Sequence, residues 1–155
     1  MSIAIAVTGL EELNGILANL GTAAATAGGT SVAIGSDNPV AAFIEHGTRP
    51  HTIAARNARA LRFNTSGGVV FARSVQHPGT KANPVLGNAL ERSQAGIVEI
   101  VNDAFTVVAT GGPVSAVTSG FRLAGELVVT DAKAHAPTRI GTYRDSITAR
   151  YTGAP

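Results

Sequence analysis

The stretch PVLGNALERSQAGIVEIVNDAFTVVATGGPVSAVTSGFRLAGELVVTDAKAH, residues 84–135, sets the architecture of this chain. Apolar residues recur in it every three or four positions, which is typical of amphipathic helices. They are Leu86, Leu90, Ile97, Val101, Ala104, Phe105 and Val108, followed by Val117, Phe121, Ala124 and Val128. Gly111-Gly112 interrupts the pattern, Pro113 suits the first position of a helix, and Ala136-Pro137 ends one. We therefore predict two long helices, the first reaching about Val108.

Shorter elements precede this pair. Residues 2–8 and 31–36 alternate small and β-branched side chains, which predicts two short strands. Between them, leucines at helical spacing predict one more helix, with Gly21 as its C-cap. These leucines are Leu10, Leu13, Leu17 and Leu20.

A short helix is predicted after the second strand. Asn38 offers a side-chain oxygen for an N-cap, and Gly47 ends the helical pattern. Phe43 and Ile44 lie within it, and we expect both to pack inward. Residues 48–57 then predict a loop.

A hairpin is the clearest strand signal. Residues 58–63 and 69–75 alternate in polarity, and the Gly-rich residues 64–68 predict the loop that joins them. Residues 76–83 predict a turn-rich loop, and residues 142–151 a helical turn that passes into a strand. The sum is an α+β fold, in which a small, mostly antiparallel sheet with a β-hairpin packs against two long helices.

The composition favours a single domain that belongs to an assembly. A chain of 155 residues suits one domain, 1–155, with residues 1–30 as a candidate peripheral arm. Charged residues make up 14% of it, against about 25% in an average soluble protein. A surface with so few charges is either neutral and polar or covered by partners.

Cysteine is absent, which excludes disulfides and thiolate chemistry. The N-terminus lacks the pattern of a secretion signal, and no apolar run reaches the length of about 20 residues that crosses a bilayer. We therefore expect a protein that is made in the cytosol, that is soluble or at least assembles there, and that has no membrane partner.

Basic residues concentrate in one segment. Residues 46–81 contain six cations and no acid, and the cations are Arg49, Arg56, Arg59, Arg62, Arg73 and Lys81. Such a segment suits a negatively charged partner, either a nucleic acid or an acidic protein face. The plainer interpretation, that these side chains only solvate a hairpin, stays open.

No motif of a catalytic or nucleotide-binding site occurs in the sequence: a nucleophile elbow, a P-loop and a dinucleotide fingerprint are all absent. His46 and His51 lie near Glu45, but Gly47 and Pro50 keep the two histidines off one helix face. Zinc would also need further ligands. We therefore expect no enzymatic activity, no metal and no cofactor.

Four segments together carry a family resemblance. They are FIEHGTRPHTI (43–53), ALRF (60–63), VVFARSVQHPGTKANPVLGNAL (69–90) and AKAHAPTRIGTYRDSI (132–147). Together they resemble the neck or tail-completion proteins of long-tailed bacteriophages. In that family a phrase like E-x-GT precedes a hairpin, HPGT-x-x-x-P follows it, and AP-x-x-TG-x-x-x-x-SI ends a long helix. In the family the long helix with the AP phrase usually comes before E-x-GT along the chain. Here it comes after the other phrases, as though the domain were circularly permuted, and Ile140-Gly141 replaces its Thr-Gly.

The resemblance implies a structural virion protein at the head–tail junction, assembled in the host cytoplasm. It implies a ring, hexameric by analogy with the tail, that contacts the tail tube or terminator and the head connector. Contacts are expected at Glu45, His46, Gly47, Thr48, Arg49, His77, Pro78, Gly79 and Thr80. A second set would line a channel for genomic DNA, without sequence specificity, or pair with acids on a neighbour: Arg56, Arg59, Arg62, Arg73 and Lys81.

Other functions stay open. Within the family, the chain could be a tail terminator or a head-closure subunit. Outside it, the basic segment 49–81 could make the chain a small nucleic-acid-binding module, without sequence specificity. A metal-dependent hydrolase using Glu45, His46 and His51 would require a bound metal.

Overall fold

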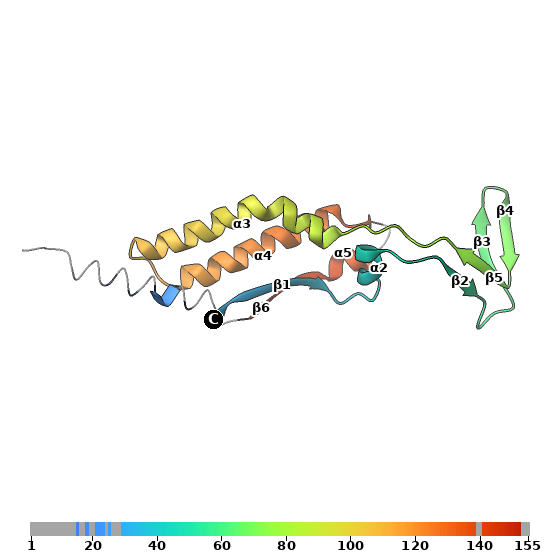
Figure 1. The fold of residues 1–155 in the computed structure, drawn as a ribbon, viewed down its shortest axis with the longest axis horizontal. Helices are drawn as coiled ribbons and strands as arrows, with labels where there is room; N and C mark the ends of the chain where they lie inside the picture. The colour runs from blue at the N-terminus through green and yellow to red at the C-terminus, as the bar shows by residue number, and fades with distance from the viewer. Residues whose placement is uncertain are drawn as a thin grey trace, which may run out of the picture. The chain divides into compact units, whose positions relative to one another are not determined.

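The protein is described from a computed structural model (Figure 1). The structure describes residues 15, 18, 21–23, 25, 29–138 and 141–152. It confirms the α+β class, with two long helices and antiparallel strands that form three separate pairs. The chain divides into two compact units, and each is described by itself. Pro39–Pro84 form one unit, and the residues up to Asn38 and from Val85 onward form the other, the body.

Two helices form the centre of the body, as predicted. They are α3 (Val85–Ala109) and α4 (Ser115–His135), and they lie side by side (Figure 1). At the turn between them the Gly112 N–H donates to the Val107 carbonyl at 2.8 Å. Pro113 lies just ahead of the N-cap residue Val114 instead of occupying the first helical position. Gly120 of α4 lies against the Cβ of Ala104 in α3, and because glycine has no side chain the two helices approach closely there.

The body is closed by a strand pair. Strand β1 (Ser31–Ser36) pairs antiparallel with β6 (Ile147–Thr152), which follows the short helix α5 (Gly141–Ser146). Both strands lie against α4, where Gly125 leaves room for Val32 and Tyr151. The predictions for residues 31–36 and 142–151 are therefore confirmed.

The described part of the body has a genuine core. Tyr143, Ile147, Val108 and Val117 are its largest fully buried side chains. An ion pair also joins the two long helices, because Arg92 donates to Asp131 from Nε at 3.0 Å and from Nη2 at 2.6 Å. The hydrogen bond and the charge of Arg92 hold the pKa of Asp131 below its ordinary value of 3.8, against a smaller opposing effect of burial.

The unit 39–84 contains a short helix and four strands. Helix α2 (Ala41–His46) is followed by β2 (His51–Ala54), β3 (Leu61–Thr65), β4 (Gly68–Ala72) and β5 (Ser74–His77). Strands β3 and β4 form the predicted hairpin, and β2 pairs antiparallel with β5. We call residues 47–81, which contain both pairs, the ribbon.

Several local predictions for the ribbon are wrong. The predicted loop 48–57 contains β2, and the predicted loop 76–83 begins with the last residues of β5. The hairpin turn consists only of residues 66–67, since the strands extend into the predicted loop 64–68. Strands β2 and β5 pair with each other across 20 to 26 positions, from Ala54↔Ser74 to His51↔His77, and a local pattern does not reveal such a partner.

The start of helix α2 also differs from the prediction. Its N-cap is Val40, with no capping side chain. Asn38 instead donates from its backbone N–H to Ser36 Oγ at 3.1 Å and from Nδ2 to Thr142 Oγ1 at 3.3 Å. Phe43 does not pack inward, because 57% of it is exposed.

The predicted strand 2–8 lies outside the described residues, as do all four leucines of the predicted N-terminal stripe. Gly21 does not end a helix, because residues 21–23 are helical, and Ala23 is buried beside Val108 and Val117. No helix among the described residues is both long and apolar enough to span a membrane.

Candidate interaction site at the base of the ribbon

Two threonines join the strands at the base of the ribbon. The Thr48 N–H donates to the Thr80 carbonyl at 2.9 Å, and the Thr80 N–H donates back to the Thr48 carbonyl at 3.2 Å. The Thr80 N–H also lies 2.9 Å from Thr48 Oγ1. Nearby, the Asn83 N–H donates to the Ile44 carbonyl at 2.8 Å, which ties the segment after β5 to α2. The base is therefore fixed by backbone hydrogen bonds.

The two strands at this base carry mirrored sequences. Reading outward, the first strand gives Thr48-Arg49-Pro50-His51, and the returning strand gives Thr80-Gly79-Pro78-His77. Threonine pairs with threonine, and His51 pairs with His77 as the first pair of the β2–β5 ladder. Each strand has one proline between these two pairs, and proline has no N–H to donate. The prolines account for the gap that separates the threonine bridge from the ladder.

Two glycines make the close approach possible. Gly47 has a φ of 70° and Gly79 a φ of 89°, both in the region that glycine favours. A Cβ at Gly47 would collide with the carbonyl oxygen of Thr80, and a Cβ at Gly79 would collide with that of Thr48. Each glycine thus packs on the threonine of the opposite strand.

The paired histidines hold different hydrogen-bonding roles. His51 Nδ1 lies 2.9 Å from the Arg49 carbonyl, so this nitrogen must carry a proton and donate it. The Gly79 N–H donates to His77 Nδ1 at 3.1 Å, so that nitrogen must be unprotonated. The ring centroids lie 5.1 Å apart. Both rings therefore stiffen the loops beside them.

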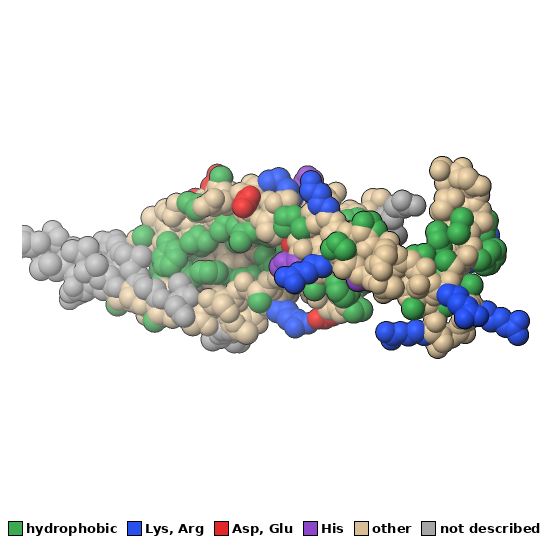
Figure 2. All heavy atoms as spheres, turned by 45° about the vertical axis from the view of Figure 1, so that its right-hand side comes forward, with side chains coloured by type: hydrophobic (Ala, Val, Ile, Leu, Met, Phe, Trp, Pro, Cys, Tyr) green, Lys and Arg blue, Asp and Glu red, His purple; other side chains and the backbone are tan. Residues whose placement is uncertain are grey.

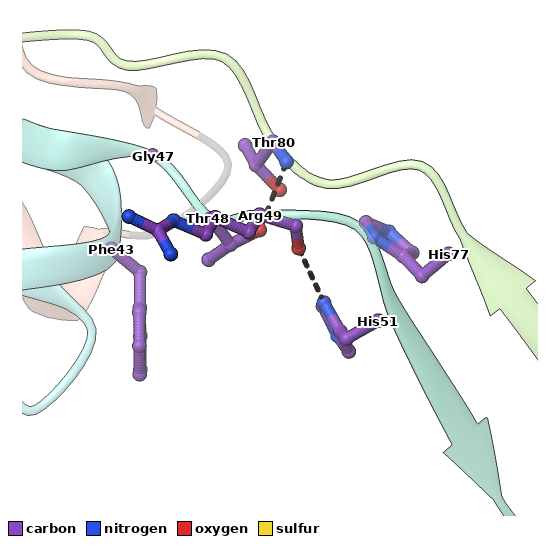
Figure 3. Close-up of a pocket in the computed structure, with 7 residues that line it drawn as sticks. All are labelled: Phe43, Gly47, Thr48, Arg49, His51, His77 and Thr80. Carbon is purple, nitrogen blue, oxygen red and sulfur yellow. Dashed lines mark hydrogen bonds between the residues drawn. The ribbon is translucent and has the colours of Figure 1, made fainter.

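A pocket of about 600 Å³ opens beside this base (Figure 3). Its lining residues are Phe43, Gly47, Thr48, Arg49, His51, His77 and Thr80. Figure 3 shows the guanidinium of Arg49 extending toward the Phe43 side and away from the two imidazoles. An apolar ring beside a cation suits a partner segment that carries an acidic and an apolar side chain.

The structure brings most of the predicted contact residues together. Glu45 and His46 end helix α2, and the others lie at the base of the ribbon. Those others are Gly47, Thr48, Arg49, His77, Pro78, Gly79 and Thr80. The sequence interpretation missed Phe43 and His51 as pocket residues. The mirrored order of threonine, proline and histidine was the signal that could have revealed the pairing of the two strands.

The cations of the ribbon do not form one site. Arg56 and Arg59 lie in the bend 56–60, Arg62 is in β3, Arg73 separates β4 from β5, and Lys81 follows the threonine bridge. All five are exposed, and within the described part of the chain none of them forms an ion pair. Figure 2 shows basic side chains projecting from the ribbon into solvent.

Apolar side chains are also exposed on the ribbon. Strands β2 to β5 contain no buried residue, and their exposed large side chains are Ile53, Val69, Val70 and Phe71. Phe71, 66% exposed, lies directly across the ladder from Arg62. An isolated pair of antiparallel strands is only marginally stable in water. The ribbon thus exposes apolar side chains on strand pairs that have no buried residue of their own.

Among the described residues, no cluster of three or more histidine and acidic side chains could hold a metal ion. In comparisons with known proteins, no family model, curated protein or solved structure matches the chain.

Proposed function

We propose that this chain is a non-enzymatic structural subunit of a tailed-bacteriophage virion, a neck or tail-completion protein. It forms a ring, taken as a hexamer, between the tail and the head connector. Genomic DNA passes through the ring without sequence-specific contacts. The alternatives within the same family are a tail terminator and a head-closure subunit, which would use the same surfaces.

The exposed surface of the ribbon carries this proposal. Ile53, Val69 and Phe71 are exposed on strands that have no core of their own. Covering such side chains stabilises a complex through the hydrophobic effect, whereas leaving them in water favours unspecific association. An assembly subunit uses such a surface, while an enzyme working as a monomer has no use for it.

The rigid base of the ribbon also supports an assembly role. The segments that resemble the phage family supply both sides of the base: Gly47-Thr48 on one strand and Gly79-Thr80 on the other. Hydrogen bonds, prolines and close glycine contacts fix the direction in which the ribbon leaves α2. A preorganised element loses less entropy on docking, which favours the ordered closure of a ring.

Electron microscopy of a lysate from phage lacking this gene tests the proposal. Filled heads beside separate, full-length tails are expected, and added purified protein should restore infectious virions. Overlong tails would assign the role of terminator. Normal, infectious virions would overturn the proposal.

Two matched variants then test whether the ribbon is needed to join heads to tails. Phe71 on the ribbon and Leu123 on α4 are 66% and 61% exposed. Phe71→Ser should fail to restore virions in that lysate, whereas Leu123→Ser should restore them. Equal restoration by both variants would contradict a joining role for the ribbon.

A second function, nucleic-acid binding, is favoured by one observation. The cations Arg56, Arg59 and Arg62 have no acidic partner in the described part of the chain. If they bind phosphates, the free protein should bind duplex DNA with an affinity that falls steeply as salt rises. Replacing Arg59 and Arg62 by alanine should abolish that binding. The joining role predicts little binding by the free subunit.

A further inference from the structure

The charges of the chain are divided unevenly between its two units. Residues 39–84 contain six cations and one acid, Glu45, whereas nine of the ten acids lie in the rest of the chain. Three of those nine are exposed on helix α3 and form no ion pair with a described residue: Glu91, Glu99 and Asp103. Unpaired cations on one unit and unpaired acids on the other are complementary surfaces.

Apolar residues accompany these acids on helix α3. Leu90 is 54% and Val98 53% exposed, although both are large aliphatic side chains. A hollow of about 360 Å³ lies beside them, lined by Leu90, Glu91, Gln94, Ile97 and Val98. It shares Leu90 and Ile97 with a second apolar hollow of the body, and Figure 2 shows hydrophobic side chains in a depression of this unit. We call the five residues lining the first hollow the α3 face.

The ribbon presents a matching surface. In an antiparallel pair, directly opposite residues lie on the same face, so Arg62 and Phe71 share one face with Asn64 and Val69. This face combines a cation, two apolar side chains and an amide. The α3 face combines an acid, three apolar side chains and an amide.

We infer that the ribbon of one copy binds the α3 face of a second copy, with Phe71 against Leu90 and Val98 and Arg62 beside Glu91. This inference rests on the proposed ring, and it names the two surfaces that meet. Because the two surfaces differ, the contact is head-to-tail, the kind that closes into a ring when the rotation permits. DNA is the poorer partner for this face, since phosphates would neutralise Arg62 but leave Phe71 and Val69 in water.

Disulfide trapping tests the contact directly, because the chain has no cysteine of its own. One full-length preparation carries Phe71→Cys, and a second, distinguished by a size tag, carries Val98→Cys. Under mild oxidation the mixture should give a disulfide-linked dimer of the two preparations. Leu123→Cys is the matched control, with a similarly exposed side chain on α4, and it should link to Phe71→Cys in much lower yield.

Charge reversal supplies an independent readout. Adding Arg62→Glu to the Phe71→Cys preparation should lower the yield of the cross-link about tenfold or more, because it places two acids together. Adding Glu91→Arg to the Val98→Cys preparation should then restore it. The helical circular dichroism of each variant should match that of the native chain, which shows that the body remains folded.

The inference is wrong if Val98→Cys and Leu123→Cys link equally, if no link forms at any protein concentration, or if charge reversal changes nothing. It is also wrong if a chain carrying both cysteines forms the disulfide within itself.

If the cross-link does not form, and the protein instead binds duplex DNA in a salt-sensitive way that Arg62→Glu abolishes, the partner of this face is a nucleic acid. If the lysate still needs this protein while the cross-link fails, the proposed ring stands and only the docking surface is wrong.

Discussion

Gly79 lies so close to the carbonyl oxygen of Thr48 that no β-carbon fits between them. Gly79→Ala should therefore open the base of the ribbon, through this collision and the positive φ, at a cost of about 1–3 kcal/mol. Hydrogen exchange at the amides of Thr48 and Thr80 should accelerate. Gly67→Ala is the control, because its β-carbon would only reach Thr65 Oγ1 at 3.8 Å, and it should leave both amides as protected as before.

The two units should respond differently to the loss of an isoleucine. Ile147 is fully buried in the body, so Ile147→Ala should lower the free energy of unfolding by about 2–5 kcal/mol. Ile53 is exposed on the ribbon, and Ile53→Ala should change it by no more than about 0.5 kcal/mol. Denaturant unfolding followed by helical circular dichroism measures both. A similar loss for both variants would reveal a core in the ribbon.

The ion pair between Arg92 and Asp131 should make stability depend on acid pH. Arg92 lowers the pKa of Asp131 in the folded state. The ionised carboxylate therefore stabilises the fold above pH 3.8, the ordinary pKa of the group, and this stabilisation is lost as the pH falls below that value. Asp131→Asn should therefore be less stable than the native chain at about pH 6, with the difference shrinking below pH 3.8. Denaturant unfolding of both chains at several pH values measures this difference, and a difference that does not shrink below pH 3.8 would contradict the stabilising role of the ion pair.

Tyr151 should make stability depend on alkaline pH. Burial, and then its hydrogen bond to Glu126 Oε1 at 2.9 Å, raise the pKa of its hydroxyl above the ordinary 10.0. The protonated form is favoured by folding, so this contribution is full below pH 10.0 and is lost as the pH rises through the raised pKa.

The sequence contains two tyrosines, so Tyr151→Phe leaves one. The absorbance titration of the native chain minus that of the variant should therefore give a midpoint above 10.0 for Tyr151. The variant should also lose less stability than the native chain above this pH. A midpoint at or below 10.0 would contradict the environment seen around the hydroxyl.

The long helices could be predicted because each carries its own signal. The stripe of α4 contains Val117, Ala124 and Val128, and all three are buried as the spacing indicates. Strand β1 and the passage from α5 into β6 were predicted for the same reason. In each case the pattern of one segment is sufficient to identify the element.

The base of the ribbon could not be predicted in this way, although most of its residues were singled out. Strand β2 begins directly after Pro50 and β5 ends directly before Pro78, and proline-rich segments usually indicate loops. These segments are strands because they pair with each other, from His51↔His77 to Ala54↔Ser74. Asn38 shows the same limit, since its side chain bonds to Thr142 in a distant segment instead of capping the nearest helix.

The pairing of β1 with β6 also determines the order in which the molecule can fold during synthesis. Ser31 and Thr152, at one end of the pair, are separated by 121 positions. Both the ribbon and the α3–α4 hairpin can therefore form on the ribosome while β1 still has no partner. Until residues 147–152 have been translated, the unpaired edge of β1 remains a template for unwanted strand pairing. Chaperone protection in the cell would be needed most during that interval.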